Sequence, residues 1–345
     1  MHPRNNALTC LLLLFLCLGL VSAAPQSAPP PPPANQTQPA APAGPSAPGQ
    51  TQQNPGQAPA TDNGVFVFKK EVQEVVLHAT VVDNKQHMIM NLGRDAFTVF
   101  ENGKPQVITS FRHEDIPVAM GIVIDNSGSM RDKREKVNTA SLNLVRASNP
   151  QDQVFVVNFN DEYYLDQDFT SSVPKLKDAL EKVEARGGTA LYDAVVASAD
   201  ELKQSRLQKR VLFVVTDGED NASRESLEEA VKRLQEPNGP TVYAIGLLGE
   251  ERQKRARRAL QTIAEDTGGI AFFPKTLDQV DEISSAVAHD IRSQYTIGYK
   301  PTTPTSAGGY RTIHVEARAK GYGKLTVRTR SGYYANSAPG QGGLN

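Results

Sequence analysis

Two stretches of the chain alternate apolar with polar residues, which is the pattern of strands that bury one face. The first stretch runs from Val65 to Phe111, and the second follows Ser293. Between the apolar runs at residues 97–100 and 107–108, the pair Asn102-Gly103 predicts a hairpin turn. The alternating positions are Val75, Leu77, Ala79 and Val81 in the first stretch, then Ile313, Val315 and Ala317, and Leu325, Val327 and Thr329, in the second.

Between these stretches the pattern changes to short apolar runs separated by helical periods. Uninterrupted runs at residues 121–124, 154–157 and 211–215 predict fully buried strands, and residues 163–169 predict an edge strand. Apolar residues three or four apart predict the helices between them, ending with the stripe Val280, Ile283, Val287 and Ile291. Alternating strands and helices predict an α/β fold, a doubly wound and mostly parallel sheet covered on both faces.

The same patterns set the expected domain boundaries. They are an N-terminal β segment over 65–116, an α/β domain over 117–292 and a C-terminal β segment over 293–335. Either flank alone is too short to bury a stable core. The simplest arrangement joins both flanks into one small β-sandwich, with the α/β domain inserted between its strands. Two independent β pieces are the alternative.

The two ends of the chain have compositions of their own. Residues 1–23 combine an early arginine, an apolar run and small residues before Ala23, as a secretory signal peptide does. An uncleaved anchor is the alternative, although the run is shorter than the roughly 20 residues of a membrane span. Residues 24–64 are rich in Pro, Ala and Gln and predict a disordered linker, and the tail 336–345 is also expected to be disordered.

Charge and cysteine content exclude several classes of function. The formal net charge is -1, so nothing indicates nucleic acid as a partner. Cys10 and Cys17 are the only cysteines, and cleavage near Ala23 would remove both. Thiolate catalysis and a cysteine-rich zinc site are then excluded. We expect an exported protein, periplasmic, cell-surface or secreted, with no stable membrane span after cleavage.

Hydroxyl and carboxylate side chains follow the first buried strand. Asp125, Ser127 and Ser129 stand at alternate positions, so an extended or gently turning chain places them on one side. Gly128 lets the backbone turn between the two serines. One carboxylate and two hydroxyls suit a hard cation such as Mg²⁺, which takes oxygen ligands.

Further oxygen ligands come from two distant positions. Asp217 follows the buried strand at 211–215, and Thr189 lies in a Gly-Gly-Thr loop just before a predicted helix. In open parallel sheets, ligands bind outside the carboxyl ends of the strands, where Asp125 and Asp217 are both expected. The alternative is structural, because single Ser and Asp residues often cap loops and helix starts.

With these residues in place, the chain resembles a von Willebrand factor type A domain. Members of that family carry an Asp-x-Ser-x-Ser loop, a distant threonine and a distant aspartate, which together form a metal-ion-dependent adhesion site. The matching residues, all present and in order, are Asp125, Ser127, Ser129, Thr189 and Asp217. The resemblance covers about residues 117–292. More loosely, the flanks resemble secreted bacterial proteins that carry this domain between β segments.

The resemblance implies a function as well as a fold. It implies one Mg²⁺ (Mn²⁺ or Ca²⁺ being possible) held by these five residues, with one or both aspartates bound through water. Because only two ligands are charged, the cation keeps positive charge and can attract an acidic side chain of a protein ligand. The expectation is therefore a non-enzymatic, exported binding or adhesion protein, with no catalytic residues.

Other functions remain open at this stage. A structural envelope scaffold with a vestigial site is one alternative. A metal-dependent hydrolase is another, but no histidine or spare glutamate is clearly placed as a general base near Asp125. Glu219 and Asp220 are expected to face solvent ahead of the next helix. The basic run from Arg252 to Arg258 fits an anionic partner less well than a solvated helix face.

Overall fold

The computed structural model describes residues 74–248 and 254–335. The predicted signal peptide, linker and tail lie outside these residues, as does the first part of the N-terminal β segment, 65–73. Within the described ranges, no helix combines the length and the apolar character that a membrane crossing requires.

The central sheet has six strands in the order β10-β9-β8-β5-β6-β7. All neighbours pair in parallel except β7, which runs antiparallel to β6 at the edge. The strands are β5 (Val118–Asp125), β6 (Gln153–Phe159), β7 (Tyr163–Thr170), β8 (Lys209–Thr216), β9 (Thr241–Gly246) and β10 (Ala271–Phe272). The fold class predicted from the sequence, a mostly parallel α/β sheet with β structure beside it, is confirmed.

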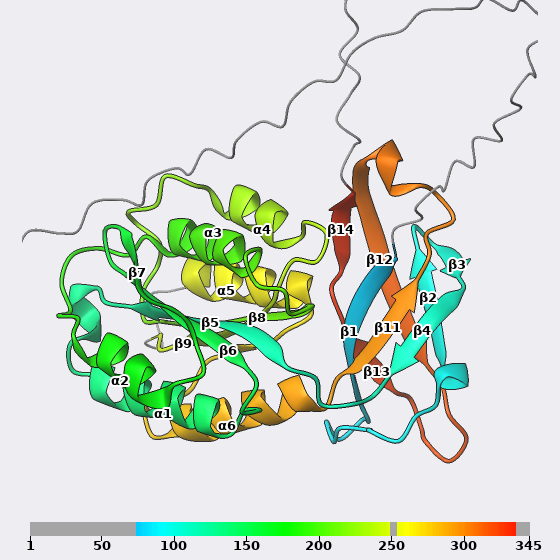
Figure 1. Cartoon of the computed structure of the whole chain (residues 1–345), viewed down its shortest axis with the longest axis horizontal. Coiled ribbons are helices and arrows are strands. Elements are labelled where there is room, and N and C mark those ends of the chain that lie inside the picture. The colour runs from blue at the N-terminus through cyan, green and yellow to red at the C-terminus, as the bar shows by residue number, and fades with distance from the viewer. Residues whose placement is uncertain (1–73, 249–253, 336–345) are drawn as a thin grey trace, which may run out of the picture. The chain divides into compact units, whose positions relative to one another are not determined.

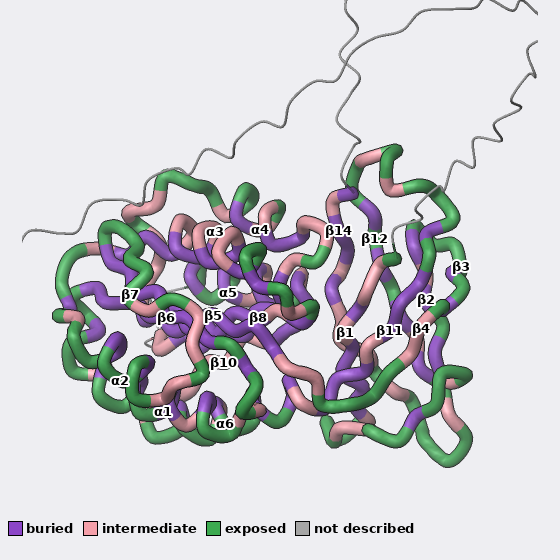
Figure 2. Tube along the Cα trace, in the orientation of Figure 1, coloured by how far each residue is buried: buried purple, intermediate pink, exposed green. Residues whose placement is uncertain are grey.

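Helices cover both faces of this sheet (Figure 1). One face packs against α1 (Arg134–Arg146), α2 (Val173–Glu181) and α6 (Gln279–Arg292). The other packs against α3 (Leu191–Leu202), α4 (Leu227–Leu234) and α5 (Lys254–Thr267). Figure 2 shows the result, with central strands buried and the outer sides of the helices exposed. The uninterrupted apolar runs follow from this arrangement, because a strand covered on both faces has no solvent side.

The flanking segments form two four-stranded sheets, in the orders β13-β1-β11-β4 and β14-β12-β2-β3. Strand β1 from the N-terminal segment pairs with β11 and β13 from the C-terminal one, and β2 pairs with β12. Strands from both segments thus share sheets and one core, which two independent pieces would not do. The strands are β1 (Val75–Val82), β2 (Phe97–Glu101), β3 (Lys104–Gln106), β4 (Ile108–Arg112), β11 (Tyr295–Tyr299), β12 (Gly309–Ala317), β13 (Thr326–Arg328) and β14 (Gly332–Ala335).

A buried polar group joins the two sheets of this sandwich. Glu101, at the end of β2, accepts from Arg311 of β12 at 2.8 Å. It also accepts from the hydroxyls of Tyr299 at 2.6 Å and Tyr333 at 3.0 Å. Both charged residues are almost fully buried, so removing either would leave the other unpaired in a low-dielectric core.

The hairpin and the C-terminal strands differ in detail from the sequence prediction. The turn at Asn102-Gly103 forms, and both residues have the positive φ that such turns require. However, the return strand is β3, and the chain leaves that sheet at Val107, which is 72% exposed, to enter the other sheet as β4. Strand β14 was not predicted, because its four residues lack a long alternating pattern.

Candidate metal site

The carboxyl ends of β5 and β8 lie side by side at one edge of the central sheet. The chain leaves β5 toward β6 on one side, whereas β8 and β9 lie on the other side. This reversal of strand order is where open α/β sheets place their ligands. Asp125 ends β5, and Asp217 directly follows the last residue of β8.

Asp125 is fully buried, and both oxygens of its carboxylate are held. Oδ1 accepts from the backbone N–H of Ser127 at 2.7 Å, and Oδ2 accepts from the hydroxyl of Thr216 at 2.6 Å. Burial raises the pKa of Asp125, and the nearby charge of Asp217 raises it further. A carboxylate in this position is oriented but poorly solvated, which favours a cation beside it.

The two serine hydroxyls connect this loop to Asp217. The Oγ atoms of Ser127 and Ser129 lie 3.2 Å apart. Ser129, in the short 3-10 helix η2 (Gly128–Met130), donates to Oδ1 of Asp217 at 2.7 Å. The side chain of Asp217 is itself fully buried. Three oxygen-bearing groups therefore form one continuous cluster beside Asp125.

The Thr189 loop closes over the same edge of the sheet. The N–H of Gly128 donates to the carbonyl of Gly187 at 3.2 Å, which ties this loop to the serine loop. Any side chain at Gly218 would come within 3.3 Å of the Thr189 hydroxyl. Glycine after Asp217 thus lets Thr189 approach. The structure brings all five predicted residues to one edge, with Thr189 in contact with the position of Gly218.

The spacing of these oxygens can be compared with the needs of a cation. Neighbouring oxygens on an octahedral Mg²⁺, each about 2.1 Å from the ion, lie about 3.0 Å apart. The hydrogen bonds that join Ser127, Ser129 and Asp217, at 3.2 Å and 2.7 Å, hold these three oxygens at spacings on either side of that value. Two carboxylates and three hydroxyls are also the oxygen ligands that hard cations prefer. The residues present therefore fit a bound Mg²⁺.

A lysine already sits next to this cluster. The ammonium of Lys133, just before α1, contacts Oδ2 of Asp217, and the lysine side chain is 29% exposed. Among the described residues, no group of three or more His, Cys, Asp or Glu is placed to hold a metal ion. The predicted site has a different composition, because hydroxyls supply three of its five groups.

Sequence reasoning missed several residues that hold the Thr189 loop. Asp161 accepts from the N–H of Gly188 at 2.8 Å, and Asn221 accepts from the N–H of Thr189 at 2.9 Å. Asp220 accepts from the N–H of Tyr192, at the start of α3, at 2.9 Å. We expected Asp220 to face solvent, but it is partly buried in this bridge. One sequence feature could have identified Asp220. It lies three residues after Asp217, in the loop that follows β8 and contacts the start of α3.

Comparisons with known proteins agree with the fold of the central domain. Residues 120–219 match the family model of the von Willebrand factor type A domain, and this range includes all five predicted site residues. No curated protein matches the chain.

Several solved structures are similar to part of the chain. The PilB minor pilin from Streptococcus sanguinis is 16% identical over 52% of this chain and 62% of the pilin, with a TM-score of 0.44. BatB from Bacteroides thetaiotaomicron is 22% identical over 51% of this chain and all (100%) of that one, with a TM-score of 0.42. A von Willebrand factor type A protein from Catenulispora acidiphila is 14% identical over 78% of this chain and 74% of that one, with a TM-score of 0.45. At this level of similarity these proteins say nothing about what the present chain binds. With the family match and the observed sheet topology together, the chain contains a von Willebrand factor type A domain.

Proposed function

We propose that this is an exported, non-enzymatic binding protein whose von Willebrand factor A domain recognises a protein ligand through a divalent cation. Asp125, Ser127, Ser129, Thr189 and Asp217 would hold the cation, with Mg²⁺ as the expected ion. The supporting observation is the buried, doubly hydrogen-bonded carboxylate of Asp125 beside a hydroxyl–carboxylate cluster with spacings close to 3 Å.

The balance of charge in the site favours an acidic ligand. Two carboxylates formally balance a divalent cation, but the other three protein groups are neutral hydroxyls, so a carboxylate from a partner would be a stronger oxygen ligand for completing the coordination. The chain's own groups orient this site, since Thr216 fixes Asp125 and Asn221 fixes the Thr189 loop. Lys133 contacts Asp217, so a cation bound there would displace its ammonium toward the rim, where it would also favour an acidic side chain from a partner.

Calorimetry on the purified chain tests the metal site. We expect saturable Mg²⁺ or Mn²⁺ binding that Asp125→Ala reduces below detection. The matched control is Glu219→Gln, which removes a carboxylate from the same loop outside the predicted set. Equal cation affinity in wild type and Asp125→Ala, with both proteins folded, would show that the site is assigned wrongly.

The ligand is tested separately. The purified chain is used to capture proteins from an envelope extract, with Mg²⁺ or with a chelator. We expect specific capture that needs the cation and that Asp125→Ala abolishes. Cation binding in calorimetry without any cation-dependent capture would favour the alternative of a structural scaffold.

A further inference from the structure

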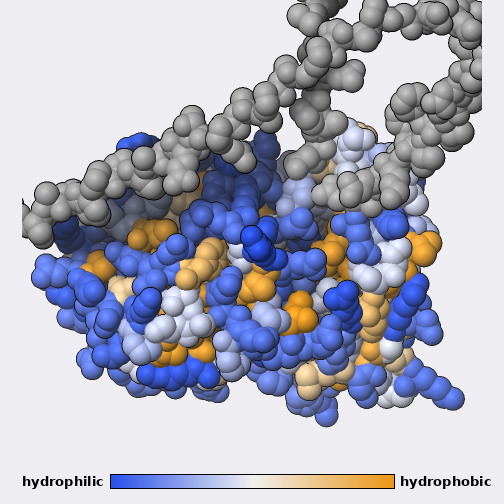
Figure 3. Space-filling view, viewed as in Figure 1, coloured by the Kyte–Doolittle hydropathy of each residue, from blue (hydrophilic) through white to orange (hydrophobic). Residues whose placement is uncertain are grey.

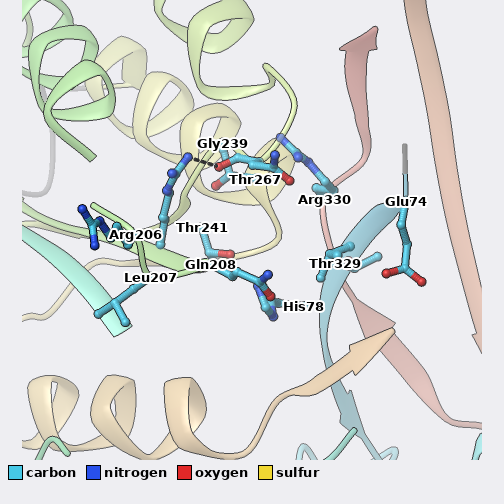
Figure 4. Close-up of a pocket in the computed structure, with 13 residues that line it drawn as sticks. Glu74, His78, Arg206, Leu207, Gln208, Gly239, Thr241, Thr267, Thr329 and Arg330 are labelled. Carbon is cyan, nitrogen blue, oxygen red and sulfur yellow. Dashed lines mark hydrogen bonds between the residues drawn. The ribbon is translucent and has the colours of Figure 1, made fainter. Parts of the chain in front are cut away.

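A second cavity lies at the opposite edge of the central sheet. It has a volume of about 290 Å³, opens partly to solvent and lies between strand β1 and the starts of β8 and β9. Figure 4 shows His78, Thr329 and Arg330 entering from the sandwich, and Gln208, Thr241 and Thr267 from the α/β domain. Small-molecule sites usually measure about 300–1,000 Å³, so this cavity is the size of a small ligand.

Arginines in the cavity wall have no carboxylate partner. Arg330 is 8% exposed and donates to the backbone carbonyls of Leu234 at 3.2 Å and Glu236 at 3.1 Å. Arg210 donates to the carbonyls of Ser205 at 3.2 Å and Asn238 at 3.3 Å, and its Nε has no partner among the described residues. Within the described chain, neither forms an ion pair. Burying a charge without a counter-charge is costly.

The other groups in the wall offset these charges only in part. Glu74 is the one carboxylate lining the cavity, and it already accepts from the hydroxyls of Thr109 and Ser110. His78 stays neutral near pH 7, because burial and the charges of Lys209 and Arg330 lower its pKa to about 3. Arg206 adds a third guanidinium to the wall. Three arginines and one carboxylate therefore line the cavity, which leaves an excess of positive charge.

A further polar group in the wall lacks a partner. The hydroxyl of Thr329 is buried and makes no hydrogen bond to any described residue. A buried hydroxyl without a hydrogen bond is destabilising, and a ligand that supplies a donor or acceptor removes this cost. The residue adjoins Arg330, so one ligand could reach both. The cavity thus combines an excess of positive charge with a hydroxyl that has no partner among the described residues.

We propose that this cavity binds a small oxyanion, a molecule with a phosphate or carboxylate group held by Arg210 and Arg330. Guanidinium groups match the planar geometry of carboxylates and the oxygens of phosphate with paired hydrogen bonds. Val76 and Leu207 also line the cavity, so a short apolar portion of the molecule can be accommodated. Because Arg210 belongs to β8 and Arg330 to the sandwich, the bound anion connects the two parts.

The site is tested on the full chain by calorimetry and thermal unfolding with three salts. Inorganic phosphate and succinate are the two ligand probes, and sodium chloride at matched ionic strength is the control. We expect saturable binding of at least one probe and a rise in melting temperature beyond that in chloride. The stronger probe identifies the class of ligand.

Variants decide whether binding occurs in this cavity. Arg210→Gln and, separately, the exposed Arg206→Gln should each weaken binding, Arg210→Gln by about tenfold or more for the loss of charge-assisted hydrogen bonds. Arg318→Gln is the matched control, since Arg318 is 85% exposed and outside the cavity. Failure of both probes to bind, stabilisation equalled by chloride, or affinity unchanged in both cavity variants would overturn the proposal. If Arg210→Gln does not fold, Arg210→Lys decides between these outcomes, because it keeps the charge but loses the paired hydrogen bonds of the guanidinium. The readout does not involve Mg²⁺, so it is independent of the metal site.

Discussion

The strands of the central sheet carry opposite charges at their two ends, and β8 contributes to both. These two ends are called the acidic edge and the basic edge below. At its carboxyl end, Asp217 joins Asp125 and the serine hydroxyls. At its amino end, Lys209 and Arg210 lie near Arg330. Between the two ends, residues 211–215 are buried and apolar. The same strand thus connects an acidic edge that suits a cation with a basic edge that suits an anion.

The length of the strand keeps the two edges electrically separate. Asp217 lies seven positions after Arg210, which is roughly 23 Å along an extended strand. At that distance two unit charges interact by only about 0.7 kcal/mol at the effective dielectric constant of about 20 that suits sites in proteins. The two edges also have different neighbours, because strand β1 of the sandwich packs against the basic edge. Perturbing one edge should therefore leave ligand binding at the other edge almost unchanged.

The largest effect is expected from deleting the N-terminal strands of the β-sandwich that packs against the basic edge. Deleting residues 74–113 removes β1 to β4 and exposes the apolar faces of β11 and β12, including Ile297 and Val315. We expect this chain to aggregate on size-exclusion chromatography. The control is residues 117–292 alone, expected to fold because both cores of the α/β domain lie within it. A soluble monomer after the deletion would mean that the C-terminal β segment does not depend on the N-terminal one.

The next largest effect concerns the acidic edge alone. Thr216→Val keeps the shape of the side chain but removes the hydroxyl that donates to Oδ2 of Asp125. Groups that orient a metal ligand typically contribute a factor of about 10–100 in affinity, and we expect a loss of Mg²⁺ affinity in that range. Titration calorimetry with Mg²⁺ measures it, and Thr139→Val, on α1 and outside both sites, is the matched control. An unchanged Mg²⁺ affinity would mean that Thr216 does not position Asp125, and a parallel loss of phosphate or succinate binding would mean that the edges are coupled.

The basic edge should also be visible in the pH dependence of stability. The pKa of His78 is about 3 in the folded chain, against 6.5 for the free side chain. Between these values the unfolded chain binds one more proton, so the free energy of unfolding falls as pH falls from about 6.5 to about 3. In His78→Gln this contribution is absent. Urea titrations at several pH values measure the free energy of unfolding. Between pH 6.5 and pH 3 it should fall more steeply with decreasing pH in wild type than in His78→Gln. Above pH 6.5 the two proteins should show the same dependence on pH.

A constant difference between the two proteins from pH 7 down to pH 4 would contradict this assignment. The comparison with His78→Gln is needed because carboxylates also contribute to acid unfolding. The basic groups that lower the pKa of His78 are Lys209 and Arg330. An anion bound in the cavity would partly neutralise these two charges and raise the pKa of folded His78. The pH range over which His78 lowers the free energy of unfolding should therefore narrow when phosphate or succinate is bound.

The acidic edge was largely predictable from the sequence, whereas the basic edge was not. Residues Asp125 and Asp217 each follow a fully apolar run, and the topology of parallel sheets places such ends together. Arg210 and Arg330 belong to segments with no shared pattern. They lie on one cavity only because β1 and the chain after β13 pack against the start of β8. Periodicity reports which face of an element is buried, but it does not report which elements meet.

Local signals also failed where a residue has two possible roles. Asn221 stands in a glycosylation-type triplet, which gives no sign of a part in the site, yet it holds the N–H of Thr189. Val107 extends an apolar run in the sequence, but the chain changes sheets there and leaves it exposed. Figure 3 shows that apolar residues are scattered in small groups over a mostly polar face. Exposed single apolar residues are common, so the run alone could not locate the change of sheet.

The smallest effect concerns the charge of the acidic edge itself. Lys133 places its ammonium on Asp217, where it competes with a bound cation for the same carboxylate. Lys133→Met keeps most of the apolar stem and removes this competition. A partly exposed ion pair contributes up to about 1 kcal/mol, so Mg²⁺ affinity should rise by at most about fivefold. Calorimetry at low and high salt measures the change, which should shrink as salt screens the lysine. The matched control is Lys136→Met, whose ammonium pairs with Asp278 rather than with the site. If Lys133→Met instead weakened Mg²⁺ binding, the lysine would support the geometry of Asp217 rather than compete for it, and the charge of the acidic edge would have to be reassigned.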